Sequence, residues 1–307
     1  MASFIGIEIG GTKLQLVRGD ESGKILERKR FTVEKSKGAA RIRQQIETGL
    51  SELTSQKKPE AIGVGFGGPV DWKTGKICRS HQIEGWSEFD LAGWLHKLAG
   101  VPVAVDNDAN VAALGEAKHG AGQGSSPVFY VTLGSGVGGG LVIDGQIYHG
   151  ATPGEAEIGH VRLDREGTTL ESRCSGWAID ARIRALVKEH PDSPLARLAS
   201  KSSGAEAKQL GSALQQNDPS ARKILDELAS DLAFGLSHAT HLFHPQVIII
   251  GGGLSHLGEL LGESVEKCLS GFTMEAFHPG PRIFLSVLGE DVVPVGAVEL
   301  ARSFCRK

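Results

Sequence analysis

The sequence predicts an α/β fold with two similar lobes, and three observations support this prediction. Apolar runs typical of strands alternate with segments whose apolar residues recur at helical spacing. The order strand–strand–strand–helix–strand–helix occurs twice along the chain. Each copy begins with two strands joined by a glycine-rich turn, at residues 10–13 and 134–140. A chain of 307 residues also exceeds the usual size of one hydrophobic core, which favours two domains.

The first copy opens with three strands, at residues 4–9, 13–18 and 25–33. Residues 38–57 are predicted to form a helix, because apolar side chains recur there at helical spacing. The remaining elements are a strand at 61–66, a helix at 87–98 with Ser87 as its N-cap, a strand at 101–105 and a helix at 111–118 that Gly120 closes.

The second copy repeats this plan. Strands flank the turn at 134–140. The elements expected after them are helices at 176–189 and 219–243, a strand at 247–250, a helix at 254–269, a strand at 283–287 and a helix at 294–305. We place the boundary between the lobes at residues 117 and 118, so that the N-terminal lobe is 1–117 and the C-terminal lobe is 118–293.

Composition and charge exclude several classes of protein. A net charge of −3 argues against a nucleic-acid-binding surface, which would need a clustered basic excess. The apolar runs, such as 247–250, are too short to span a bilayer. The first strand begins by residue 4, so we expect no signal peptide. The four cysteines show no paired spacing and are interpreted as reduced thiols of a cytoplasmic protein.

Both glycine-rich turns indicate phosphate binding. Glycine adopts positive φ and lets backbone N–H groups approach an anion without a Cβ in the way. A hydroxyl residue lies in or beside each turn. The residues concerned are Gly10, Gly11, Thr12 and Lys13 in the first turn, and Thr132, Gly134, Ser135 and Gly136 in the second. Two such turns in matching positions predict a duplicated core that grips a nucleoside triphosphate from both sides.

The second turn also fits the dinucleotide-binding pattern G-x-G-x-x-G. That pattern requires a helix to follow, so that the pyrophosphate meets the helix N-terminus. An apolar strand-like run follows residues 134–139 instead. The Rossmann interpretation is therefore rejected.

Asp108 is the best candidate for a general base. It lies where a predicted strand gives way to a helix, which is the edge of an α/β sheet where ligands bind. A helix N-terminus also stabilises the charged carboxylate. The simpler alternative is that Asp106 or Asp108 only caps the helix, and the sequence leaves open whether one caps while the other performs chemistry.

Three further groups of residues are candidates. Glu157, His160 and Glu171 could bind neighbouring sugar hydroxyls, or they could be solvated charges of a surface turn. Residues 251–253, all glycine after an apolar strand, would let an adenosine approach the sheet end, or would simply make a tight turn. His238, His241 and His244 recur at three-residue steps, but no carboxylate or cysteine completes a metal site, so helix-end histidines are favoured.

Taken together, these motifs resemble those of the ROK family of sugar kinases and repressors, within the actin, hexokinase and Hsp70 ATPase superfamily. They follow the family's order along nearly the whole chain: residues 10–13, 67–69, 107–116, 132–140, Glu157-x-Gly-His160 and 251–253. The resemblance implies two lobes of duplicated ribonuclease H-like fold with a cleft between them. It also implies that the last helix, 294–307, completes the N-terminal lobe, and that the protein is a homodimer.

The resemblance implies a role for each candidate. Asp108 would accept the proton of a sugar hydroxyl as that hydroxyl attacks the γ-phosphate of ATP. Gly68, Asn107, Glu157, His160 and Glu171 would hold the hexose. The two turns would hold the phosphates of ATP, Gly252 and Gly253 would hold its adenosine, and Mg²⁺ would neutralise charge.

The chain departs from the family's pattern at two places. Glu8 stands where the family has an aspartate that positions the magnesium hydration shell, and Glu8 is expected to act there through water. The family's zinc-binding pattern C-x-C-G-x-x-G-C is missing between His160 and Glu171, and Cys174 comes after it. His160 and one thiol cannot complete a tetrahedral site, so no zinc is expected.

The function predicted is therefore ATP-dependent phosphorylation of a hexose. Glucose is the first expected acceptor, at O6, with N-acetylhexosamine or fructose next. The alternative is a non-catalytic sugar-binding relative of these kinases. Repressors of the family carry a helix-turn-helix segment before the phosphate turn, and here that turn begins at residue 10. We therefore expect a sugar as the partner, and neither a nucleic acid nor a membrane.

Overall fold

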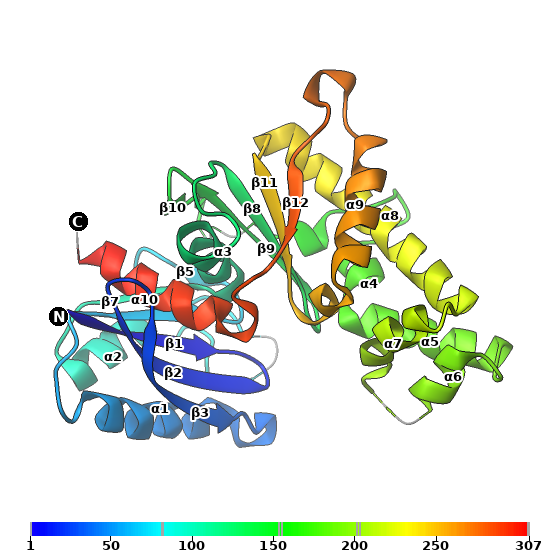
Figure 1. The fold of residues 1–307 in the computed structure, drawn as a ribbon. Coiled ribbons are helices and arrows are strands. Elements are labelled where there is room, and N and C mark those ends of the chain that lie inside the picture. Colours follow the sequence, from blue (N-terminus) through cyan, green and yellow to red (C-terminus); the bar gives the residue numbers. More distant parts are fainter. Residues whose placement is uncertain are drawn as a thin grey trace. The chain divides into compact units, whose positions relative to one another are not determined.

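The chain folds into two compact units (Figure 1). The structure is a computed structural model that describes residues 2–80, 83–152, 154, 156–200, 202 and 204–305. The first unit comprises the chain up to Gly124, residues 140–156 and the chain from Val287 onward, and the second comprises residues 125–139 and 157–286. Within the described ranges there are two five-stranded sheets and a two-stranded one. The predicted α/β class with a duplicated plan is confirmed.

The first large sheet has the strand order β3-β2-β1-β4-β7. β1 pairs antiparallel with β2 and parallel with β4, which pairs parallel with β7. The carboxyl ends of these three parallel strands therefore meet at one edge of the sheet. The strands are β1 (Ser3–Ile9), β2 (Lys13–Asp20), β3 (Ile25–Thr32), β4 (Ile62–Phe66) and β7 (Val103–Asn107).

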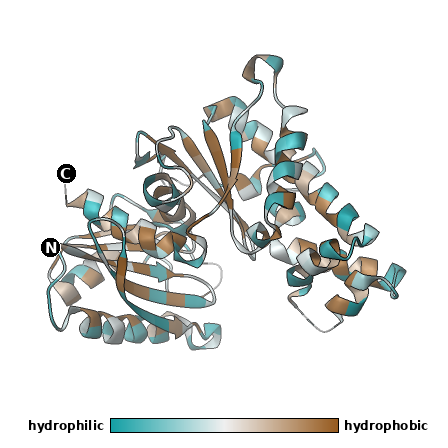
Figure 2. Cartoon of the chain, viewed as in Figure 1, coloured by the Kyte–Doolittle hydropathy of each residue, from teal (hydrophilic) through white to brown (hydrophobic). Residues whose placement is uncertain are grey.

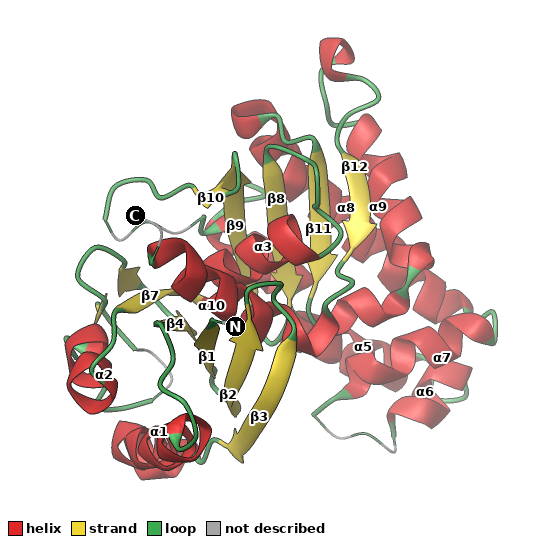
Figure 3. Cartoon of the chain, turned by 60° about the vertical axis from the view of Figure 1, so that its left-hand side comes forward, coloured by secondary structure: helices red, strands yellow, loops and turns green. Residues whose placement is uncertain are grey.

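Helices cover both faces of this sheet (Figure 3). α1 (Gly38–Thr54) packs on one face, where Ile7 and Ile46 belong to the same buried cluster. α10 (Val292–Phe304) packs on the other, where Val17 and Val298 lie in a separate cluster. Alternating strand residues therefore reach opposite cores. The last helix of the chain thus lies within the first unit.

Helix α2 (Leu91–Ala99) begins later than predicted, and the assignment of Ser87 as its N-cap is wrong. Asp90 is the N-cap, and its carboxylate accepts a hydrogen bond from Gly93 N at 2.9 Å. The Ser87 hydroxyl instead accepts from Ser80 N at 3.2 Å. A serine before an apolar run can satisfy a turn as well as a helix end, which is why its local sequence did not distinguish the two.

The second large sheet repeats the order of the first, as β10-β9-β8-β11-β12. β11 pairs parallel with both β8 and β12. These strands are almost entirely hydrophobic, as Figure 2 shows for β11. The strands are β8 (Val128–Leu133), β9 (Val137–Ile143), β10 (Gln146–Ile147), β11 (Val247–Gly251) and β12 (Arg282–Leu285). Since β9 begins at Val137, the second glycine-rich turn is shorter than predicted.

The remaining elements surround these sheets. β5 (Val70–Asp71) and β6 (Lys76–Ile77) form the small sheet, and α3 (Asp108–His119) follows β7. The helices of the second unit are α4 (Leu170–Cys174), α5 (Gly176–Glu189), α6 (Pro194–Ala199), α7 (Leu210–Gln215), α8 (Pro219–Phe243) and α9 (Glu259–Ser270). No helix in the described part of the chain is long and apolar enough to cross a membrane.

The division into units differs from the boundary expected at residues 117 and 118. The first unit runs on to Gly124 and also takes in residues 140–156, so the chain passes between the units inside β9. Gly140 explains this position, because a Cβ there would lie 2.7 Å from both Ala109 O and Ala113 Cβ of α3. The later part of β9 therefore packs closely on a helix of the first unit.

Candidate active site

The first unit places Asp108 at the junction of a strand and a helix. β7 ends at Asn107 and α3 begins at Asp108, as the base assignment required. The cap of α3 is neither aspartate. Asn107 Oδ1 accepts hydrogen bonds from Ala109 N at 2.8 Å and from Asn110 N at 3.3 Å. Asp108 is half-buried in the first helical turn, where its charge is favoured by the helix dipole.

Gly67 brings this carboxylate close to the first glycine-rich turn. Gly67 follows β4, and its N–H donates to Ile9 O at 2.9 Å. A Cβ on Gly67 would lie 3.3 Å from Asp108 Oδ2 and 3.7 Å from Gly10 Cα. The ends of the three parallel strands thus gather the candidate base and the predicted phosphate turn at one edge of the sheet.

The first turn itself is closed by a hydrogen bond from Gly10 N to Lys13 O at 3.0 Å. Thr12 is exposed at its tip. Just before the turn, the Glu8 carboxylate accepts from Gln15 Nε2 at 2.8 Å and lies 3.5 Å from Lys13 Nζ. Burial raises the pKa of Glu8, and this outweighs the lowering by Lys13 and Gln15.

Gly68 and Asn107, two of the predicted sugar contacts, lie together in the same unit. Asn107 Nδ2 donates to Gly68 O at 3.2 Å. The Asn107 side chain therefore joins the loop after β4 to the start of α3, on either side of the candidate base. This contact leaves one lone pair of the Gly68 carbonyl for a ligand.

The second unit assembles the other predicted nucleotide residues. Thr132 lies in the last part of β8, Ser135 is exposed, and Gly134 N donates to Gly136 O at 3.0 Å across the turn. Gly252 has φ +81°, and a Cβ there would lie 2.6 Å from Leu133 O. The turn at Gly252 and Gly253 therefore packs directly against the end of β8, beside the phosphate turn.

The three candidates for sugar binding in the second unit differ in their settings. Glu157 and His160 flank a single 3₁₀ turn, and His160 Nδ1 lies 3.5 Å from the Glu157 carboxylate. Both side chains are exposed, at 50% and 74%, and so are open to a ligand. Glu171 lies near this turn, since its Oε2 accepts from Val137 N at 2.9 Å, while a Cβ on Gly159 would clash with Val137 O. Its carboxylate thus sits at the end of the phosphate turn.

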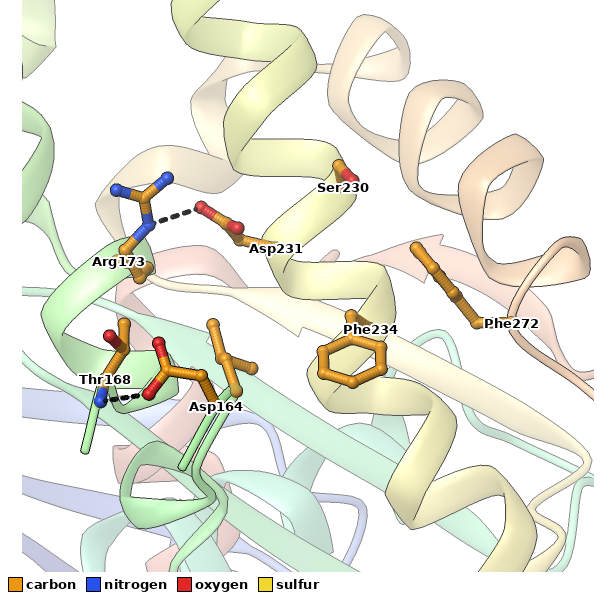
Figure 4. Close-up of a pocket in the computed structure, with 8 residues that line it drawn as sticks. Asp164, Thr168, Arg173, Ser230, Asp231, Phe234 and Phe272 are labelled. Carbon is orange, nitrogen blue, oxygen red and sulfur yellow. Dashed lines mark hydrogen bonds and ion pairs between the residues drawn. The ribbon is translucent and has the colours of Figure 1, made fainter. Parts of the chain in front are cut away.

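The segment between His160 and Glu171 is closed by hydrogen bonds, and the helix that follows it is held by an ion pair (Figure 4). Asp164 Oδ1 accepts from the N–H groups of Gly167 and Thr168, both at 2.9 Å, which closes a tight turn. On α4, Arg173 Nε donates to Asp231 Oδ2 of α8 at 2.8 Å. A cavity of about 360 Å³ lies here, lined by Leu163, Asp164, Thr168, Arg173, Ser230, Asp231, Phe234 and Phe272.

The structure does not gather the three helix-end histidines into a metal site. His244 stacks on Phe277 with ring centroids 3.9 Å apart, and His241 Nε2 accepts from Met274 N at 3.2 Å. His238 packs edge-on against Phe234. Among the residues that the structure describes, no group of three or more histidine, cysteine or acidic side chains could hold a metal ion.

Comparisons with known proteins identify the family. The model of the ROK family matches residues 4–303. The chain belongs to the ROK family. The glucokinase of Halalkalibacterium halodurans is 32% identical over 95% of this chain and 93% of that protein, and the glucokinase of Thermotoga maritima is 31% identical over 97% of both. The resemblance inferred from the sequence is therefore confirmed.

Solved structures of the ROK family have the same fold. The ROK family glucokinase of Streptomyces griseus, solved with glucose and AMPPNP, superposes with a TM-score of 0.86 at 32% identity and covers 98% of this chain and 100% of that one. The similarity to these kinases extends across both units.

Sequence reasoning missed one set of contacts in the first unit. Asp106, Asn110 and His149 are joined by hydrogen bonds beside Asn107 and Asp108. Asn110 lies within the recognised motif and Asp106 directly before it, which was the available signal. Nothing in the local sequence marks His149, because its partner lies 43 positions away.

Proposed function

We propose that this protein is an ATP-dependent glucokinase that transfers the γ-phosphoryl group of ATP to O6 of glucose. The observation that carries the proposal is the position of Asp108 at the sheet edge, next to Gly67 and the turn at Gly10. The glucokinase relatives, each matched over nearly its full length, support glucose as the acceptor.

Asp108 acts as the general base in this proposal. The sugar oxygen attacks the γ-phosphorus, the bond from that phosphorus to the bridging oxygen breaks, and ADP leaves. The hydroxyl proton passes to the Asp108 carboxylate. General-base assistance of this kind contributes about 10²- to 10⁴-fold to a rate.

The glycine-rich turns supply backbone N–H donors to the phosphates. The turn from Gly10 to Lys13 does so in the first unit, and that from Thr132 to Gly136 in the second, where Gly252 and Gly253 receive the adenosine. The N–H groups of Gly10 and Gly134 are not among these donors, because they close the turns themselves. Lys13 adds a positive charge, and its present contact with Glu8 is a long one at 3.5 Å. Phosphoryl transfer gains most from alignment and charge neutralisation of this kind.

Gly68, Asn107, Glu157, His160 and Glu171 hold the sugar in this proposal. The exposure of Glu157 and His160 supports their role, because a carboxylate and an imidazole together accept and donate hydrogen bonds to adjacent hydroxyls. The bond from Val137 N to Glu171 ties one sugar ligand to the phosphate turn, so both substrates are positioned by one local structure.

The residues present fit a divalent magnesium ion. Glu8 offers carboxylate oxygens, the ligand type that magnesium prefers, directly before the phosphate turn. When bound, magnesium supplies neutralisation of the phosphate charge. Glu8 would hold its hydration shell through water. No zinc is part of the proposal, because no cysteine lies between His160 and Glu171, and His160 with one thiol cannot complete a tetrahedral site.

The first test is ADP release from Mg-ATP across a panel of hexoses with a no-sugar blank. We expect release that depends on glucose, with little from fructose or N-acetylhexosamines. Release with another member of the panel would replace glucose as the acceptor. A flat panel, from protein shown to be folded, would instead support the non-catalytic sugar-binding alternative.

Two finer parts of the proposal have separate tests. The protein is proposed to be a homodimer, as the family resemblance implies, and to hold no zinc. It is also proposed to be cytoplasmic and to bind no nucleic acid, because its cysteines show no paired spacing and its net charge is −3. Light scattering during gel filtration would contradict the dimer if the mass were that of one chain. Elemental analysis of purified protein should detect no stoichiometric zinc, and one zinc per chain would refute that part.

A further inference from the structure

A buried histidine–carboxylate pair lies beside the candidate base in the first unit. His149 Nε2 lies 2.6 Å from Asp106 Oδ2, and the two side chains are 13% and 4% exposed. The imidazole also stacks on Trp72, with ring centroids 4.2 Å apart and planes 13° from parallel. Since a carboxylate can only accept, Nε2 carries the donated proton. The ring is therefore fixed by a hydrogen bond and by an aromatic contact.

Asp106 connects this histidine to the start of α3. Its Oδ1 accepts from Asn107 N at 2.8 Å and from Asn110 Nδ2 at 3.0 Å. Both oxygens of the Asp106 carboxylate thus accept hydrogen bonds: Oδ1 from residues at the start of α3 and Oδ2 from His149. Because Asn107 and Asn110 stand on either side of Asp108, the network fixes the backbone that carries the candidate base.

His149 also packs against Gly154 of the same unit. A Cβ on Gly154 would lie 2.9 Å from His149 Cβ, so the chain turns back tightly onto the histidine. Gly154 O accepts from Asn110 Nδ2 at 3.2 Å. The chain passes from the first unit to the second between Ala156 and Glu157. His149 and Gly154 are therefore held together in the first unit, and Gly154 lies three positions before Glu157 in the sequence.

We propose that His149 is a positioning residue for sugar binding. By donating to Asp106 it holds Asn107 in place, and Asn107 in turn donates to the Gly68 carbonyl. The inference rests on the proposed function, in which Asn107 and Gly68 hold the sugar. The phosphate turns make none of these contacts, so ATP binding is independent of His149.

Two substitutions separate the hydrogen bond from the stacking. His149→Gln keeps a donor close to the position of Nε2 and loses the ring. His149→Phe keeps a ring against Trp72 and loses the donor. The matched control is His119→Phe, because His119 Nε2 lies 3.1 Å from Glu299 Oε2 in a second buried pair of the same unit, with side chains 18% and 1% exposed.

The measurements are kcat, KM for glucose, KM for ATP and the thermal unfolding midpoint. We expect H149F to raise KM for glucose about tenfold, as small displacements of a positioned group do, while KM for ATP changes less than about twofold. H149Q should recover most of the loss. H119F should lower the unfolding midpoint and leave both KM values unchanged. Should H149F not fold, His149→Leu replaces it as the variant without a donor.

Several outcomes would overturn the inference. These are a wild-type KM for glucose in H149F, an equal rise of both KM values, or full activity in H149F together with a loss in H149Q. Calorimetric titration with glucose in the absence of ATP repeats the comparison without turnover. If the wild-type protein releases no ADP, the proposed function fails, whereas a tenfold weaker glucose Kd in H149F would still support the role of His149.

Discussion

Helix α3 has a histidine–carboxylate pair at each of its ends, and the two pairs have different neighbours. At its start, Asp106 binds His149 two positions before the half-buried Asp108. At its end, Glu299 accepts from His119 at 3.1 Å and from Arg302 at 2.7 Å, and these groups bind only α3 to α10. The chemistry is the same, but only the first pair adjoins an accessible carboxylate at the ends of parallel strands.

The two ends differ also in how the remaining polar groups are used. Glu116, near the end of α3, is fully buried and accepts from Ala121 N at 2.8 Å and from Leu288 N at 3.1 Å. These two bonds close loops of the fold. A buried charged group is therefore not by itself a sign of function, and what lies next to it decides the interpretation.

The largest expected effect is at the start of α3, from Asp108→Asn. We expect kcat to fall about 10²- to 10⁴-fold, because the amide cannot accept the hydroxyl proton. The Kd for glucose should change little, because the asparagine side chain has nearly the same shape as the aspartate that it replaces. Asp20→Asn, in an exposed turn of the same unit, is the control. Unchanged turnover in D108N would remove Asp108 as the base.

At the other end of α3, Glu299→Gln should affect stability and not catalysis. Removing one member of a buried ion pair leaves Arg302 without its counter-charge, and we expect the free energy of unfolding at pH 7 to fall by about 3 kcal/mol. Urea denaturation measures this change. Glu290→Gln removes an ion pair with Arg30 in which the glutamate side chain is 71% exposed. This change should lower the free energy of unfolding by less than about 0.5 kcal/mol. A raised KM for glucose in E299Q would contradict the distinction between a functional start and a structural end of α3.

Acid should weaken the same end of the helix. Burial raises the pKa of Glu299, but hydrogen bonds and charge from His119 and Arg302 prevail and lower it to about 2, below the ordinary value of 4.5. The stability that this carboxylate contributes is therefore complete above pH 4.5 and is lost as the pH falls toward 2. The stability difference between wild type and E299Q should shrink across this window; a constant difference would show that Glu299 has an ordinary pKa.

Two glycines provide the smallest and sharpest contrast. In Gly67→Ala the new Cβ would lie 3.3 Å from Asp108 Oδ2, which must move by a few tenths of an ångström. We expect kcat to fall up to about tenfold with little loss of stability. In Gly115→Ala the Cβ would lie 2.6 Å from Val292 O, a backbone atom that cannot yield easily. That variant should lose about 1–3 kcal/mol of stability at normal kcat. Loss of stability in both variants would contradict the contrast.

The sequence predicted the helices and strands well, because the spacing of apolar residues and the residue types of turns act over only a few positions. The helix at residues 176–189 and the first three strands agree with the structure, and so does the strand that follows the second phosphate turn. The start of α3 shows the limit of such reasoning. Three polar residues, 106–108, could each cap a helix, and the backbone geometry selected Asn107.

Contacts between distant residues could not be predicted in this way. His149 meets Asp106 only because β7 and the segment after β10 come together in the folded unit. Arg173 contacts Asp231 across a separation of 58 residues. This contact holds the helix that follows the loop from which the family's zinc-binding cysteines are missing. Such partners depend on topology, and no short-range signal reports it.

The position of α10 has a consequence for how the protein is made. Phe4 and Val17 leave the ribosome long before Val298 and Ala301, which cover them. One face of the first sheet therefore stays open while the chain between β2 and α10 is synthesised. A nascent chain with such an exposed apolar surface is vulnerable to aggregation and open to chaperones until α10 emerges.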